Sequence, residues 1–110
     1  MVRGASNVHK FYISIDQSQI AKVEAVYYQN GEIILTKTDR DMEYNSVEEC
    51  YIVNLDQYDT LLFHKVGIPT PVKESLITIQ FKFLTKDDDV WVSKPVQDRL
   101  YDVIHSEVLR

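Results

Sequence analysis

Residues 20–38, IAKVEAVYYQNGEIILTKT, have the clearest strand and turn pattern of this chain. Apolar and polar side chains alternate before and after Asn30-Gly31, which is the pattern of half-buried strands. Asn-Gly is the dipeptide most typical of a two-residue hairpin turn, because both turn residues must adopt positive φ. We therefore predict an antiparallel hairpin whose strands span 20–28 and 32–38.

The same turn predicts how the two strands are aligned. With only the Asn-Gly dipeptide in the loop, an unbroken ladder places Glu24 opposite Lys37 and Lys22 opposite Asp39. Two opposite-charge pairs on one face would stabilise the pairing. A slip of one residue would turn every side chain to the other face, so these pairs test the predicted register.

Near the turn, both faces of the predicted hairpin are apolar. One face carries Ala25, Tyr27 and Ile34, and the second sheet of a sandwich would cover it. The opposite face is covered either by another part of the chain, such as 40–49 or the C-terminal segment, or by another subunit. We take the subunit contact as the hypothesis, because tyrosine is favoured at protein interfaces. The predicted interface consists of Val26, Tyr28, Ile33 and Leu35, with Tyr28 opposite Ile33 and Val26 opposite Leu35.

Further segments have the composition of strands. The apolar positions of 75–85 alternate with polar ones from Ile77 to Phe83, and the polar segment 40–49 is predicted to be a loop or a short edge strand. About seven short strands separated by turn signals predict a mostly β chain, folded as an antiparallel β-sandwich. One domain is expected to span 1–110. The other predicted strands are 11–15, 50–55 and 90–93.

A polar interruption separates two apolar runs in YIVNLDQYDTLLFHK, residues 51–65. Asp56 suits a helix N-cap, and Asp59, three residues later, suits the acidic position of a capping box. We predict a short helical turn at 56–60, located at a corner where the chain passes from one sheet to the other. The next strand is predicted to start at 61–63.

The C-terminal end is consistent with two interpretations. Apolar residues spaced from Val96 to Val108 fit a helical stripe, and Pro95 suits a helix start. Residues 96–101 also fit a last strand of the sheet. We predict an extended piece followed by a short C-terminal helical segment.

Composition argues against several functional classes. The net charge is −5, and an acidic surface repels phosphate backbones, so no nucleic-acid partner is expected. No apolar run approaches the roughly 20 residues that cross a bilayer, so no membrane partner is expected. The single cysteine, Cys50, predicts no internal disulfide and is expected to be a buried small hydrophobe. These features predict a protein made and kept in a reducing cytosol, or packed into something assembled there.

No set of side chains has the spacing of a catalytic or metal site. His9, His64 and His105 lie far apart and form neither an HxH nor an HxxxH pair. The acidic run 87–89 lacks the glycine and the distal glutamate of an EF-hand loop, so it is interpreted as a solvated hairpin tip. Nucleophile-elbow, dinucleotide and P-loop signatures are also missing from the sequence. We therefore predict no enzymatic activity, no cofactor and no metal.

Several short motifs resemble those of small structural proteins of tailed bacteriophages and prophages of Gram-positive hosts. The matching pieces are LDQYDTLLF at 55–63, ITIQFKF at 77–83, the hairpin at 86–88 and Ser93. The sequence differs from these proteins by an Asp at the hairpin glycine position and by an inserted GIPTP loop at 67–71. The resemblance implies an immunoglobulin-like sandwich located in a virion, as a capsid-associated, connector or tail component.

The expected function is that of a non-enzymatic virion structural protein, bound to other virion proteins and to copies of itself. Two alternatives stay open. One is a prophage-encoded intracellular inhibitor whose acidic surface occupies a host protein. The other is a carbohydrate-binding sandwich, whose contact would be formed by Trp91 and the nearby aspartates.

Overall fold

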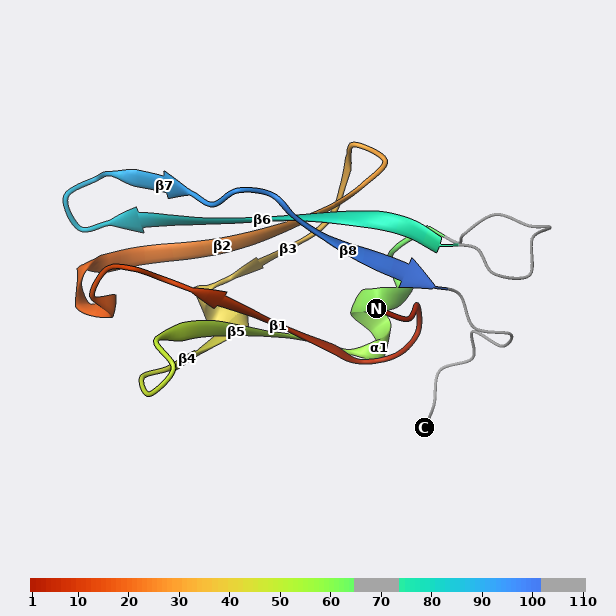
Figure 1. Cartoon of the computed structure of the whole chain (residues 1–110), viewed down its shortest axis with the longest axis horizontal. Helices are drawn as coiled ribbons and strands as arrows, with labels where there is room; N and C mark the ends of the chain where they lie inside the picture. Colours follow the sequence, from red (N-terminus) through yellow and green to blue (C-terminus); the bar gives the residue numbers. More distant parts are fainter. Residues whose placement is uncertain (65–73, 102–110) are drawn as a thin grey trace.

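Figure 1 shows a computed structural model of the chain, in which two antiparallel sheets pack face to face. The structure describes residues 1–64 and 74–101. Within them, the strands and the α-helix follow in this order: β1 (Asn7–Tyr12), β2 (Ile20–Gln29), β3 (Glu32–Thr38), β4 (Met42–Asn45), β5 (Cys50–Leu55), α1 (Gln57–Leu61), β6 (Glu74–Thr85), β7 (Val90–Val92) and β8 (Val96–Tyr101).

The described residues form a three-stranded sheet, in the order β1-β5-β4, and a five-stranded sheet. In the larger sheet β3, β2 and β6 follow one another, and both β7 and β8 pair with β6 along its other edge. All pairs of these strands are antiparallel, so the predicted antiparallel β-sandwich is confirmed. The immunoglobulin-like form of the sandwich stays a prediction.

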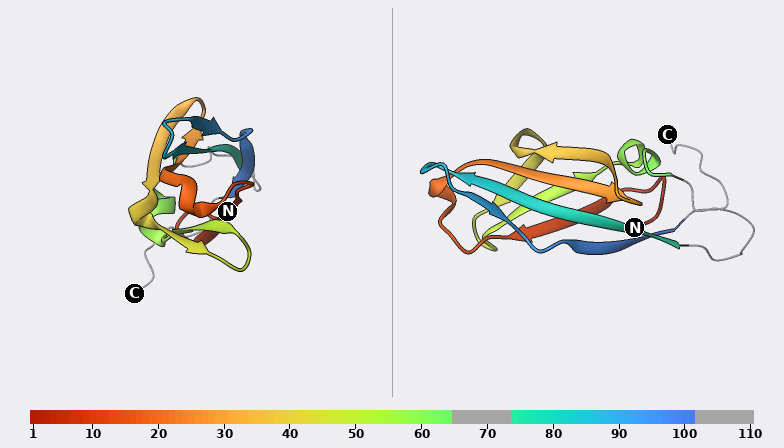
Figure 2. Two further views of the ribbon diagram at one scale, coloured as in Figure 1. Left: turned by 90° about the vertical axis from the view of Figure 1, so that its left-hand side faces the viewer. Right: turned by 90° about the horizontal axis from the view of Figure 1, so that it is seen from above.

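The core lies between the two layers, which Figure 2 shows from the end and from above. The alternation predicted for residues 75–85 is confirmed, because Ile77, Ile79 and Phe81 of β6 are buried in this core. Phe11 of β1 stacks on Phe81 with ring centroids 4.8 Å apart, which ties the small sheet to the large one. The buried core residues are Ile13, Val23, Ala25, Tyr27, Leu35, Tyr51, Val53, Leu55, Phe63, Ile77, Ile79, Phe81 and Leu100.

The Asn-Gly hairpin is confirmed, with φ of 52° at Asn30 and 77° at Gly31. Its predicted register is wrong beyond the first two pairs. Tyr28 faces Ile33 as expected, but the next pair joins Tyr27 to Leu35, so Ile34 is an extra residue that forms a β-bulge.

The bulge also overturns both predicted charge pairs. Lys37 faces Ala25 instead of Glu24, and Glu24 faces Thr38. Glu24 lies 3.5 Å from Lys82 on the neighbouring strand β6. Asp39 has already left the ladder, because it begins a 3₁₀ turn over Asp39–Asp41, and this explains why it cannot face a residue of β2.

The capping box predicted for the helical turn at 56–60 is confirmed. The Asp56 side chain accepts a hydrogen bond from the Asp59 backbone N–H at 2.8 Å, and the Asp59 carboxylate accepts one from the Asp56 N–H at 3.0 Å. The chain passes from the small sheet to the large one through α1. The strand predicted to start at 61–63 is wrong, because Leu61 ends the helix and Phe63 lies buried in the turn that follows.

Other boundaries differ in smaller ways from the predicted ones. The strand predicted at 11–15 is displaced toward the N-terminus, at Asn7–Tyr12, because the chain turns into a 3₁₀ element capped by Asp16. Segment 40–49 contains the short edge strand β4, one of its two predicted forms. The extended piece predicted at 96–101 is confirmed as β8. The GIPTP loop and the predicted C-terminal helical segment lie outside the described residues.

Candidate functional site

The structure divides the four residues of the predicted hairpin interface. The bulge turns Leu35 toward the core, where its side chain is only 9% exposed beside Tyr27. Val26 is also buried, because it lies on the central strand β2 with Thr36 and Gln80 beside it on the neighbouring strands. Leu35 and Val26 are therefore not opposed and offer little surface.

The remaining two residues stay on the outer face of the five-stranded sheet. Tyr28 and Ile33 form a cross-strand pair, with Tyr28 half-buried and Ile33 59% exposed. Their role in an interface stays a prediction. A surface of two side chains is small for a contact site.

A larger group of exposed apolar side chains lies along the opposite edge of the same sheet. We call this the edge patch, and its exposed fractions run from 52% to 65%. The Trp91 ring lies parallel to the Phe83 ring, with centroids 6.2 Å apart, so one of its faces is supported by the sheet. The residues of the edge patch are Val90, Trp91 and Val92 of β7 and Val96 at the start of β8.

The backbone of β7 is unpaired on its outer side. The Thr85 N–H donates to Asp89 C=O at 2.9 Å, and the Ser93 N–H donates to Phe81 C=O at 2.8 Å. In an antiparallel ladder these groups alternate in direction, so the odd-numbered residues of β7 bond to β6. The N–H and C=O groups of Val90 and Val92 therefore point away from the sheet, and no described residue pairs with them.

An edge of this kind is a ready template for another strand, which most proteins block. Here charges and a proline stand at its two ends, with the acidic turn at Asp87–Asp89 on one side and Lys94-Pro95 on the other. The sequence analysis predicted a strand at 90–93 but did not identify it as an edge. The local pattern did not carry that information, because three consecutive apolar residues are equally typical of a strand covered on both faces.

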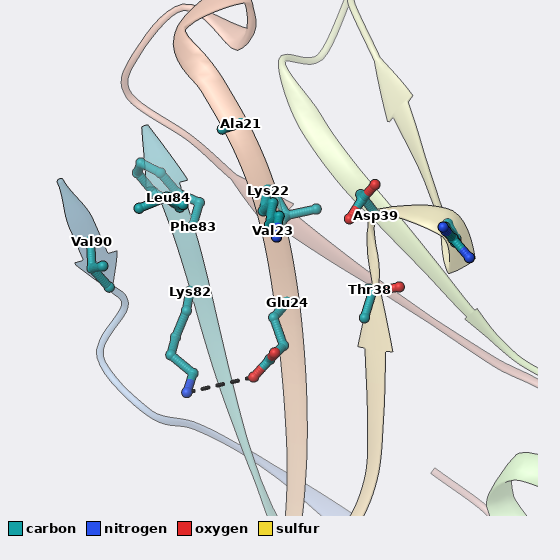
Figure 3. A pocket seen from close by; sticks show the side chains of 11 residues that line it. Ala21, Lys22, Val23, Glu24, Thr38, Asp39, Lys82, Phe83, Leu84 and Val90 are labelled. Carbon is teal, nitrogen blue, oxygen red and sulfur yellow. Dashed lines mark ion pairs between the residues drawn. The ribbon is translucent and has the colours of Figure 1, made fainter. Parts of the chain in front are cut away.

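A depression of about 690 Å³ lies on the outer face of the large sheet, between the 3₁₀ turn and β7 (Figure 3). It contains Lys22 and Asp39, which were predicted to pair; no ion pair joins them in the described part of the chain. Its walls carry both signs of charge, including the Glu24–Lys82 pair, and it reaches the edge patch at Val90.

A second polar cluster lies between the sheets. His9 of β1 is hydrogen-bonded through Nδ1 to the Tyr27 hydroxyl at 2.9 Å and through Nε2 to Asp98 Oδ2 at 2.9 Å. Burial raises the pKa of Tyr27, whose side chain is fully enclosed. No ligand reaches that hydroxyl, so the cluster joins β1 to β2 and β8 as a structural contact. From the sequence His9 was expected to belong to no metal pair, and Tyr27 and Asp98 were not identified as its partners.

The remaining candidates are also structural or exposed. Cys50 is buried, and this burial raises the pKa of its thiol, so a thiolate is disfavoured. His64 lies 3.2 Å from Glu32, while His105 lies outside the described residues. Among residues 1–64 and 74–101, no group of three histidine, cysteine or acidic side chains is placed to hold a metal. The same residues include no helix with the length and apolar content needed to cross a bilayer.

Comparison of the chain with models of protein families, with curated proteins and with solved structures finds no match. The features of this chain that point to a function are therefore the edge patch, the residues around it and the short motifs quoted above.

Proposed function

We propose that this protein acts through protein–protein contacts, as a non-enzymatic structural component of a tailed-phage particle with an immunoglobulin-like sandwich. The observation that carries the proposal is the edge patch, where exposed apolar side chains coincide with unpaired backbone groups. Such an edge is costly in a free monomer, because it invites pairing with other chains. A protein that is incorporated into an assembly covers it.

The polar side chains of the sandwich favour the same interpretation. The His9–Tyr27–Asp98 cluster and the Lys37–Asp59 pair hold elements of the two sheets together. The motifs at 55–63 and 77–83 resemble those of phage structural proteins, and this resemblance is the reason for proposing a phage particle. In the structure the first motif forms the capped corner and the second lies in β6. Other virion proteins and further copies of this chain are the proposed partners.

The test is incorporation into particles. A Val92→Lys variant places a charge in the edge patch, whereas Val47→Lys changes a residue that is 91% exposed in the turn between β4 and β5. Mass spectrometry of purified particles is expected to find stoichiometric copies of wild type and of the Val47 variant, and few or none of the Val92 variant. Absence of the wild-type protein from particles would contradict the virion proposal.

Carbohydrate binding is a second candidate, favoured by one observation. The Trp91 ring is supported by Phe83 on one face and is 53% exposed, which suits stacking on a sugar ring. Glycan-array binding that is lost in Trp91→Ala but kept in Val47→Lys would favour this function. Absence of glycan binding by the wild type would exclude carbohydrate binding as a function.

A further inference from the structure

We propose that two copies of this chain pair through β7, edge to edge and antiparallel, about a two-fold axis that passes beside Trp91. The pairing would join two five-stranded sheets into one continuous sheet. This inference depends on the proposed function, since it takes the edge patch to be a contact surface, and it adds the identity of the partner.

The unpaired backbone groups of β7 complement themselves. When two β7 strands run antiparallel with Trp91 opposite Trp91, Val90 of each copy faces Val92 of the other. Only these two residues carry outward N–H and C=O groups, so each Val90–Val92 pair exchanges two hydrogen bonds. The two Trp91 residues then form the closely spaced, non-hydrogen-bonded pair between them. Every free group of β7 is satisfied in this single register.

The side chains of β7 agree with this register on both faces of the sheet. Val90 lies opposite an outer-face residue, Leu84, while Trp91 lies opposite Phe83, whose ring packs against the core. Across the two-fold axis, valine would meet valine on the outer face and tryptophan would meet tryptophan on the inner one. Apolar and aromatic cross-strand pairs of this kind stabilise antiparallel sheets.

Charge complementarity favours a second copy over an arbitrary strand. In the same register the turn Asp87–Asp89 that precedes β7 in one copy, with Asp88 in it, lies beside Lys94 of the other copy, and the two-fold axis repeats this contact at the other end. Both side chains are exposed, and neither forms an ion pair within the described residues. A parallel pairing would instead place Asp88 against Asp88 and Lys94 against Lys94. The antiparallel register is therefore the one that the charges select.

The ends of β7 also fit a contact of limited length. Pro95 has no N–H to donate, and it follows immediately after Lys94. Pro95 limits the strand on one side and the turn at Asp87–Asp89 limits it on the other, so the ladder stops at the two Val90–Val92 pairs. The contact is thus confined to β7 and its two charged flanks.

Sedimentation equilibrium of the full chain tests the pairing. Wild type is expected to form a concentration-dependent dimer. Lys94→Asp alone and Asp88→Lys alone are each expected to raise the dimer dissociation constant by about tenfold or more, because like charges then meet at both ends. An equimolar mixture of the two variants should restore association, since every opposed pair is again of opposite sign. Circular dichroism and thermal melts check that each variant remains folded.

Oxidative cross-linking tests the position of the axis. Non-hydrogen-bonded pairs bring Cα atoms to about 4.5 Å, which is within the range of a disulfide. Trp91→Cys is therefore expected to give a covalent dimer, while Val47→Cys serves as the control that does not; Cys50 is buried and does not compete.

Two outcomes separate this inference from the proposed function. A wild-type chain that stays monomeric at all concentrations, together with a Val92→Lys variant that is lost from particles, would overturn self-pairing. In that case another virion protein occupies the edge. If Val92→Lys also enters particles normally, both the self-pairing and the contact role of the edge patch are wrong.

Discussion

Lys37 Nζ and Asp59 Oδ2 lie 3.0 Å apart, and this ion pair joins β3 of the large sheet to α1, which follows the small sheet. Both side chains are mostly buried, with exposed fractions of 16% and 19%. Lys37 reaches Asp59 only because the bulge at Ile34 turns it to the inner face. The same Asp59 oxygen accepts the Asp56 N–H, so the inter-element contact and the helix cap share one atom.

A double-mutant cycle should measure this pair. Lys37→Met keeps the aliphatic stem, and Asp59→Asn keeps an oxygen that accepts the Asp56 N–H. We expect a coupling energy of about 1 kcal/mol from urea unfolding of the wild type, both single variants and the double variant. Additive single effects would show that the contact contributes nothing to stability.

The cap itself is tested at Asp56. Its carboxylate accepts the Asp59 N–H at 2.8 Å. Asp56→Ala should lower the free energy of unfolding by about 1 kcal/mol, because one N–H of the first turn loses its acceptor. Asp56→Asn keeps an acceptor and should stay close to wild type in thermal melts. Equal stability of the alanine variant and the wild type would exclude a capping role.

The bulge predicts opposite outcomes for two residues that lie close together in β3. Leu35 is buried in the core, so Leu35→Ala should cost about 2–4 kcal/mol of unfolding free energy. Ile33 is exposed, so Ile33→Ala should change stability by about 0.5 kcal/mol or less. Chemical denaturation distinguishes the two registers, since an unbroken ladder puts both residues on the outer face and predicts similar, small effects.

Phe63 and Leu62 form a second matched pair, in the turn after α1. Phe63 is buried and packs edge-on against Tyr27, with ring centroids 6.3 Å apart. Phe63→Ala should cost about 3–5 kcal/mol, because it leaves a cavity between the sheets. Leu62 is exposed, and Leu62→Ala should be nearly neutral. Similar melting temperatures for the two variants would contradict the burial of Phe63.

Asp98 should make stability depend on acid pH. Burial of its carboxylate acts to raise its pKa, but the hydrogen bond with His9, the N-terminal ammonium of Met1 at 3.6 Å and the hydrogen bond from the Arg99 N–H act against it, and the net pKa is lowered. Because the folded pKa is below the unfolded value of about 4, ionised Asp98 stabilises the fold above that value. This contribution disappears as the pH falls through the folded pKa.

Asp98→Asn is therefore expected to be less stable than wild type near neutral pH, with a difference that shrinks toward about pH 3. Urea unfolding of Asp98→Asn and of the wild type at several pH values measures this difference and its decrease. A constant difference across this range would mean that the charge of Asp98 contributes nothing to the stability of the fold.

Features that depend on near neighbours in the chain were predictable from the sequence. The Asn30-Gly31 turn, the Asp56–Asp59 capping box and the alternation along β6 each follow from residues within a few positions of one another. Turn dihedrals, helix caps and the two-residue period of a strand are local properties, so they can be predicted before the packing of the chain is known.

The surfaces that these elements present were not predictable from the local sequence pattern. The bulge at Ile34 lies in the pairing of β3 with β2, and β2 also pairs with β6 on its other side. The bulge turns Leu35 and Lys37 to the core side of the sheet. In the same way, β7 is an edge only because β6 is its single neighbour in the described sheet. Strand order and register are set by contacts between distant segments, and the exposure of the edge patch depends on that order rather than on the local pattern.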